Sequence, residues 1–143
     1  MVSTQARTRR DDAVHTADLR IEAWAPTREA CIAEAVVGLV DSFVAAVPPQ
    51  RSTSFDCEVT GEDDTDLLVA VLTQVIHRLR VANEVPTAVE VLAAPTGLRL
   101  HWQLIDAAAL LPVGALPKAV SLRGLRCTRR ADGQWSCAVT IDV

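Results

Sequence analysis

Oxygen-bearing residues stand near both ends of this sequence. An H-T-A-D motif begins at His15, and its last residue, Asp18, directly precedes a strand-like segment. At the other end Asp142 is followed by Val143, whose free main-chain carboxylate would lie beside the Asp142 side chain. Calcium and magnesium favour such hard oxygen ligands, and water or main-chain carbonyls complete their coordination shell. If the first and last strands lie side by side, these three residues can share one divalent cation. Alternatively, Asp18 and Asp142 are turn or cap residues at strand ends and bind no cation.

Arginine residues gather near the end of the sequence, at Arg123, Arg126, Arg129 and Arg130. A guanidinium binds phosphate or carboxylate as a planar fork, so this patch could contact phosphate or an acidic partner surface. A hairpin edge that charge protects against aggregation would have the same composition. We expect Arg123 to be largely exposed and to lie near Asp18.

The familiar motifs of catalysis and of structural zinc are missing from the sequence. It has no glycine-rich phosphate loop, no G-x-S-x-G and no H-E-x-x-H, and its four cysteines include no C-x-x-C pair. The acidic run at 62–66 lacks the ligand spacing of an EF-hand, and the positive end of a helix dipole explains it better. His77 and His101 fit solvated or structural positions, which leaves His15 as the candidate base or partner contact.

Composition places these residues in one small globular domain. The chain has 143 residues, of which half are apolar and 22% are charged, so it can bury a core of its own. A net charge of −4 argues against a domain that coats nucleic acid with a basic face, so an RNA partner would be reached only indirectly. No apolar run approaches the ~20 residues of a membrane helix, and residues 1–12 are unlike a signal peptide. We expect a cytoplasmic protein with no membrane partner.

Hydrophobic periodicity divides the chain into helices and strands. Residues 1–14 show no periodicity and are expected to form a flexible arm, whereas residues 15–143 form a single domain. Apolar spacings of three and four predict two amphipathic helices, the first capped by Thr27 and the second by a residue of 63–65. The predicted elements are a strand around 19–23, a helix over 28–47, a strand around 55–59, a helix ending near 83, and two hairpins over 87–105 and 120–142.

The order β-α-β-α-β-β-β-β predicts an α+β fold. We expect a two-layer sandwich in which two amphipathic helices pack on a mainly antiparallel sheet. In the last hairpin, a three-residue turn at 131–133 would place Cys127 opposite Cys137 and Leu125 opposite Val139. The two thiols are expected to be buried and, in a reducing cytosol, unbonded.

Several segments of the chain resemble the archease family, in order, from about Val14 to Val143. The H-T-A-D start and the Asp-Val end are the most specific marks. The other matching residues are Ile21-Glu22-Ala23, Thr27 at the helix start, Asp66-Leu67-Leu68-Val69 with Leu72, and Ile141. The resemblance implies a small α+β protein that is not itself an enzyme. It implies an accessory protein of the RtcB-type RNA ligase that seals tRNA halves in tRNA splicing, whose GTP-dependent guanylylation and repeated turnover it promotes.

The resemblance also implies a metal site. Archeases hold a calcium ion with the aspartate of the opening motif, the aspartate before the last residue, and the last residue itself. The matching positions here are Asp18, Asp142 and Val143. These are the oxygen donors already singled out above, and the choice between calcium and magnesium stays open.

The segment Ser121–Thr128 departs from the family. Many archeases have a stretch like E-I-K-A-V-T-Y-H before the last hairpin, and its glutamate, lysine and histidine are all replaced here. Arg123 keeps the positive charge of the lysine, but a guanidinium does not exchange protons as a compact amine does. A proton-transfer step is therefore not carried over, whereas partner or phosphate contacts remain the expectation for Arg123, Arg126 and His15.

Two other classes of function remain open. A small metal-dependent hydrolase would use the same oxygens to position a metal-bound water, and it would need a base and a pocket nearby. A metal-independent, chaperone-like binding module would engage its partners through the apolar loop at 107–116.

Overall fold

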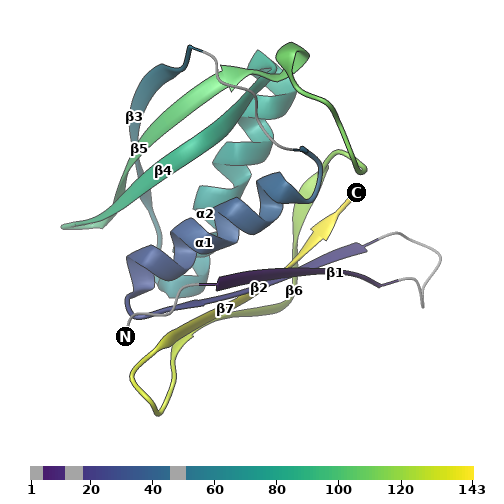
Figure 1. Ribbon diagram of the computed structural model, residues 1–143. Coiled ribbons are helices and arrows are strands. Elements are labelled where there is room, and N and C mark those ends of the chain that lie inside the picture. The colour runs from purple at the N-terminus through teal and green to yellow at the C-terminus, as the bar shows by residue number, and fades with distance from the viewer. Residues whose placement is uncertain (1–4, 12–17, 46–50) are drawn as a thin grey trace.

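The computed structural model describes residues 5–11, 18–45 and 51–143 of the chain. Within these ranges two α-helices and seven strands follow one another in the order β-β-α-β-α-β-β-β-β (Figure 1). The elements are β1 (Gln5–Asp11), β2 (Asp18–Ala25), α1 (Arg28–Asp41), β3 (Thr53–Thr60), α2 (Asp64–His77), β4 (Glu84–Ala94), β5 (Gly97–Asp106), β6 (Ala119–Arg129) and β7 (Trp135–Asp142). A π-helical turn at Arg78–Ala82 continues α2, and a 3-10 turn at Ala107–Ala109 follows β5.

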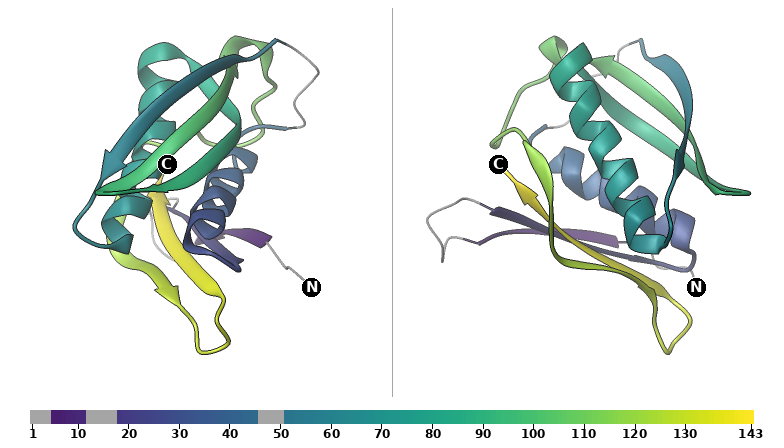
Figure 2. Two further views of the ribbon diagram at one scale, coloured as in Figure 1. Left: turned by 90° about the vertical axis from the view of Figure 1, so that its left-hand side faces the viewer. Right: turned by 180° about the vertical axis from the view of Figure 1, so that it is seen from behind.

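The strands form two antiparallel sheets, and the helices lie between them (Figures 1 and 2). One sheet has the order β1-β2-β7-β6 and the other has the order β3-β5-β4. α1 contacts both β2 and β4, and α2 contacts both β6 and β3. The α+β class and the predicted order of elements from Asp18 onward are confirmed. The strands form two sheets rather than one, and each helix packs against strands of both.

β1 lies in the segment that was expected to be a flexible arm. It pairs with β2 in an antiparallel register that runs from Gln5 opposite Trp24 to Asp11 opposite Asp18. The sequence of Gln5–Asp11 has no apolar alternation. Its strand is defined by main-chain pairing along β2, which the periodicity of side chains does not reveal.

Local signals correctly predicted how β2 and the two helices begin. The odd-numbered residues of β2 are buried and the even-numbered ones are partly exposed along its whole length. Thr27 Oγ1 accepts a hydrogen bond from the Ala30 N–H at 3.1 Å, and Asp63 Oδ1 accepts one from the Asp66 N–H at 2.8 Å. Each of these caps satisfies an N–H group that the first helical turn leaves without a partner.

α1 ends at Asp41, before the position near residue 47 that the sequence predicted. The Ser42 hydroxyl donates to the Leu39 carbonyl at 2.6 Å, and such side-chain bonds to the main chain compete with the helix. Val44 then pairs with Pro112 in an isolated β-bridge. The end of α1 is thereby joined to the loop between β5 and β6.

The predicted hairpin over 87–105 is present as β4 and β5. Gly97 is the first residue of β5 and pairs with Ala94 across a two-residue connection. A Cβ atom at Gly97 would lie 1.9 Å from the Val59 carbonyl oxygen. The glycine is therefore needed for the close approach of β3 to β5.

The last hairpin confirms the predicted pairing of the cysteines. Cys127 lies opposite Cys137, and Gly133 has a φ of +87° in the turn. The predicted pairing of Leu125 with Val139 is wrong, because the register of β6 shifts between Ser121 and Arg126. This shift is a β-bulge in β6.

The core fills the space between the two sheets. Its largest fully buried side chains come from both helices and from strands of both sheets, among them Ile21, Ile32, Leu72, Leu100 and Ile141. In the part of the chain that the structure describes, no helix is long and apolar enough to cross a membrane.

Candidate functional site

Asp18 and Asp142 lie directly opposite each other on neighbouring strands. β2 and β7 are antiparallel neighbours, and their register pairs Asp18 with Asp142. Residues that face each other in this way point to the same side of the sheet, with Cβ atoms ~4.5–5.5 Å apart. The next residue on each strand, Leu19 and Ile141, is buried in the core, so the two carboxylates lie on the outer face. The structure thus brings together the first and last acidic residues of the predicted site.

The end of the chain follows the same alternation. The side chain of Val143 packs against the core, on the same side of the sheet as Ile141. The main-chain carbonyl of Asp142 accepts a hydrogen bond from the Lys118 N–H at 2.7 Å. This bond ties the last residues of β7 to the start of β6.

Two carboxylates directly opposite each other in a sheet repel and destabilise the pairing. A divalent cation between them would remove this repulsion, and oxygen is the ligand that calcium and magnesium prefer. In residues 18–45 and 51–143, no group of three or more His, Cys, Asp or Glu side chains is placed to hold a metal ion. The predicted set of Asp18, Asp142 and Val143 contains only two such side chains. These two carboxylates, directly opposite each other, offer the oxygen ligands that a hard cation prefers.

Arg123 is the basic residue next to this pair. Its Nη2 atom lies 3.7 Å from Asp18 Oδ2, and its side chain is 81% exposed whereas that of Asp18 is 17% exposed. Arg123 belongs to β6, so its side chain reaches across β7 to Asp18 on β2. Arg123 is therefore exposed and close to Asp18, as the sequence predicted.

The β-bulge in β6 accounts for this reach. Ser121 pairs with Thr140 and Arg126 pairs with Ala138, so β6 uses more residues than β7 between these two pairs. Gly124, within the bulge, has a φ of +66°, a conformation that L side chains rarely adopt. Leu122 and Leu125 of the bulge line a hollow beside the start of α2. Arg123 belongs to the same bulge, and its side chain reaches Asp18.

Arg20 is a functional candidate that the sequence analysis did not single out. It follows Asp18 by two residues in β2 and therefore lies on the same face of the sheet. Its Nη1 donates to Thr140 Oγ1 at 3.0 Å, and a Cβ atom at Gly124 would lie 3.0 Å from the same nitrogen. The strand alternation around Asp18 was the signal that could have identified it.

Arg126 and His15 are not placed at this site by the structure. Arg126 pairs with Ala138, four residues along β7 from Asp142, a spacing of about 13 Å in an extended strand. Its Nη2 instead donates to Ser136 Oγ at 3.1 Å. His15 lies outside the residues that the structure describes.

The described histidines lie away from the carboxylate pair. His77 is exposed at the end of α2. His101 is on β5, in the other sheet, where its Nδ1 pairs with Asp56 on β3. Neither supplies the base that a hydrolase would need beside Asp18.

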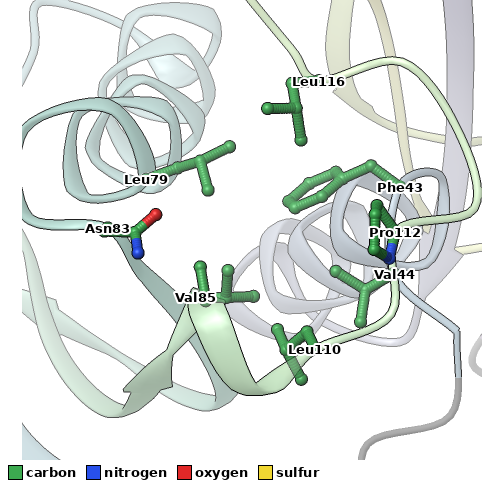
Figure 3. A pocket seen from close by; sticks show the side chains of 9 residues that line it. Phe43, Val44, Leu79, Asn83, Val85, Leu110, Pro112 and Leu116 are labelled. Carbon is green, nitrogen blue, oxygen red and sulfur yellow. The ribbon is translucent and has the colours of Figure 1, made fainter.

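A second feature is an apolar pocket next to the loop between β5 and β6. It lies between the end of α1, the turn after α2 and this loop (Figure 3). The loop also exposes Leu111, Val113 and Leu116, which are 70%, 58% and 51% accessible. The residues lining the pocket are Phe43, Val44, Leu79, Asn83, Val85, Ala107, Leu110, Pro112 and Leu116.

Comparison with known proteins gives consistent matches over nearly the whole chain. The model of the archease protein family (MTH1598/TM1083) matches residues 12–143. Two curated sequences named "Probable protein archease", from two strains of Mycobacterium tuberculosis, are 46% identical over 129 residues, which is 90% of this chain and 72% of theirs. The solution structure of Methanobacterium thermoautotrophicum protein 1598 is similar with a TM-score of 0.66 at 18% identity, and the match covers 98% of each chain. That structural likeness shows a shared fold.

Proposed function

Because this chain belongs to the archease family, we propose that it is an accessory protein of an RtcB-type RNA ligase and not itself an enzyme. In this role it binds a divalent cation, with calcium as the first candidate, and promotes guanylylation and turnover of the ligase in tRNA splicing or RNA repair. It works in the cytoplasm, contacts the ligase as a protein partner, and reaches RNA only indirectly.

The observation that supports the cation site is the register of β2 and β7. It places Asp18 opposite Asp142 on one face, next to the last residue of the sequence. Asp18, Asp142 and the main-chain carboxylate of Val143 would hold the ion. The ion would supply positive charge that cancels the repulsion between these groups.

The residues of this chain then determine what the site presents to a partner. Pairing of β2 with β7 joins the beginning and the end of the domain, so a shared ligand stabilises both strands. The bulge in β6 holds Arg123 beside the pair with most of its side chain in solvent. Its planar fork matches a phosphate or carboxylate of the ligase.

The apolar pocket supports a second candidate function, a metal-independent, chaperone-like binding module. Three large apolar side chains of the loop are exposed around it, whereas such residues are usually buried. This surface could bind an apolar segment of a partner without any contribution from Asp18 or Asp142. A metal-dependent hydrolase gains no comparable support from the described residues.

The test is calorimetry with calcium chloride and with magnesium chloride on the wild-type chain and on Asp142→Asn. The substitution keeps the shape of the side chain and removes one charge, so calcium binding should be lost. Glu90→Gln is the matched control, since Glu90 is an exposed carboxylate on β4 in the other sheet. It should bind calcium like the wild type.

The same variants should then be compared in a ligase guanylylation assay with GTP. Asp142→Asn should fail to stimulate the ligase, and Glu90→Gln should stimulate it fully. Equal stimulation by both variants would refute the cation-dependent role. Adding one glycine after Val143 converts its carboxylate into a peptide carbonyl, and the proposal expects weaker calcium binding from this chain too.

A further inference from the structure

Asp18 already has a positively charged neighbour in the protein. Within residues 18–45 and 51–143, Arg123 is the only residue that forms an ion pair with Asp18, at 3.7 Å. With Asp18 and Asp142 both ionised, this guanidinium offsets one of two negative charges. The Arg123 guanidinium thus takes the position beside Asp18 that a bound cation would need.

The two partners of this ion pair are held very differently. The Asp18 side chain is largely covered and fixed in β2, whereas the Arg123 side chain is 81% exposed. Exposed ion pairs with long side chains contribute little free energy, because holding the side chain in place costs conformational entropy. A hard divalent ion binds carboxylate oxygens directly at ~2.0–2.6 Å and carries twice the charge. The cation should therefore outcompete the guanidinium.

Arg20 on the same face shows the opposite behaviour. Its guanidinium donates to Thr140 Oγ1 and lies close to Gly124, so it is anchored without Asp18. Arg20 would keep its position when a cation enters. The difference between the two arginines makes Arg123 the mobile charge of this site.

We propose that Arg123 is a removable counterion of Asp18, which a divalent cation displaces. In the cation-free protein the guanidinium forms an ion pair with the Asp18 carboxylate. Cation binding releases it into solvent on the bulge of β6, where it is free to bind the partner. Binding of the cation and availability of Arg123 are thereby coupled, and this regulation rests on the proposed cation site.

The direct test follows the Nε–Hε resonance of Arg123 by NMR while calcium chloride is added to the intact chain. Arg123→Lys assigns the resonance, and sodium chloride at equal ionic strength controls for screening. The Arg123 resonance should move with the same midpoint as calcium binding. The resonance of Arg126, which is bonded to Ser136, should stay in place.

Calorimetry gives an independent readout. Arg123→Ala should bind calcium about two- to fivefold more tightly, as expected from loss of a competing exposed ion pair. Arg126→Ala is the matched control because it removes the same charge from the same strand without contacting Asp18. It should change the calcium affinity less.

The outcomes separate the inference from the site on which it rests. If the wild type binds calcium but the Arg123 resonance does not move, or if Arg123→Ala binds no more tightly than Arg126→Ala, the displacement is refuted and the cation site stands. If the wild type binds no calcium, the proposed cation site itself is refuted together with the displacement.

Discussion

The thiol of Cys31 on α1 lies 3.0 Å from the thiol of Cys137 on β7. Cys137 also lies 3.4 Å from Cys127 on β6, so three buried sulfur atoms form a chain between the first helix and the last hairpin. All three cysteines are free. Hydrogen bonds with Cys127 and Cys31, together with burial, raise the pKa of the Cys137 thiol far above its usual range. Because all three side chains are buried, these thiols act as small packing groups of the core.

The native protein should leave these three cysteines unreacted with iodoacetamide at pH 8. Alkylation requires an accessible thiolate, and the three side chains are buried in the core. Cys57 on β3 is only partly buried and serves as the internal control. Peptide mapping by mass spectrometry should find label on Cys57 first and on the other three only after unfolding. Early labelling of Cys137 would contradict the packing described here.

Gly124→Ala should destabilise the fold by roughly 1–2 kcal/mol. A residue with a Cβ atom is strained at a φ of +66°, and that atom would also press on Arg20 at 3.0 Å. Gly124→Asn tests the cause, since asparagine tolerates the left-handed conformation better than alanine. Urea denaturation should rank the wild type above the asparagine variant and the asparagine variant above the alanine variant. Equal stability of alanine and asparagine would show that φ is not the cause.

Asp63 should make α2 sensitive to acid. Hydrogen bonds from the Asp66 N–H and from the Thr65 hydroxyl lower the pKa of the Asp63 carboxyl. Its stabilising contribution is therefore complete above the unfolded value of about 3.9 and is lost as the pH falls through the lower folded value. Asp63→Asn keeps a cap that does not titrate. Melting temperatures measured from pH 7 to pH 2 should fall less steeply for this variant than for the wild type.

Glu34 should have the opposite effect on stability. Burial, and to a lesser extent the charge of Asp41, raise the pKa of the Glu34 carboxyl. The folded state then holds the proton more tightly than the unfolded chain, so stability decreases as the pH rises above the unfolded value of about 4.3. Glu34→Gln should remove this loss and be more stable than the wild type at pH 7. Urea denaturation of both proteins at pH 4 and pH 7 measures this difference in stability. If Glu34→Gln showed the same pH dependence as the wild type, a raised pKa of Glu34 would be contradicted.

The elements whose form depends on nearby residues were predictable. Alternation in β2 defined which side chains face the core, and so placed Asp18 on the outer face. The caps of both helices and the pairing of Cys127 with Cys137 could also be predicted from the sequence, because each depends on residues close together in the chain. The family resemblance identified Asp18, Asp142 and Val143 as the residues to examine.

The relationships between distant segments were decided by the tertiary structure alone. Periodicity says which face of a strand is apolar but not which strand pairs with it, and only the register of β2 with β7 places Asp18 opposite Asp142. The division into two sheets, with each helix in contact with both of them, also joins segments far apart in the chain. The bulge that carries Arg123 to Asp18, and the contact of Cys31 with Cys137, likewise arise from packing between distant segments. The pattern of side chains determines the local conformation of each element. The contacts between distant segments form only when the helices and sheets pack and bury their apolar faces.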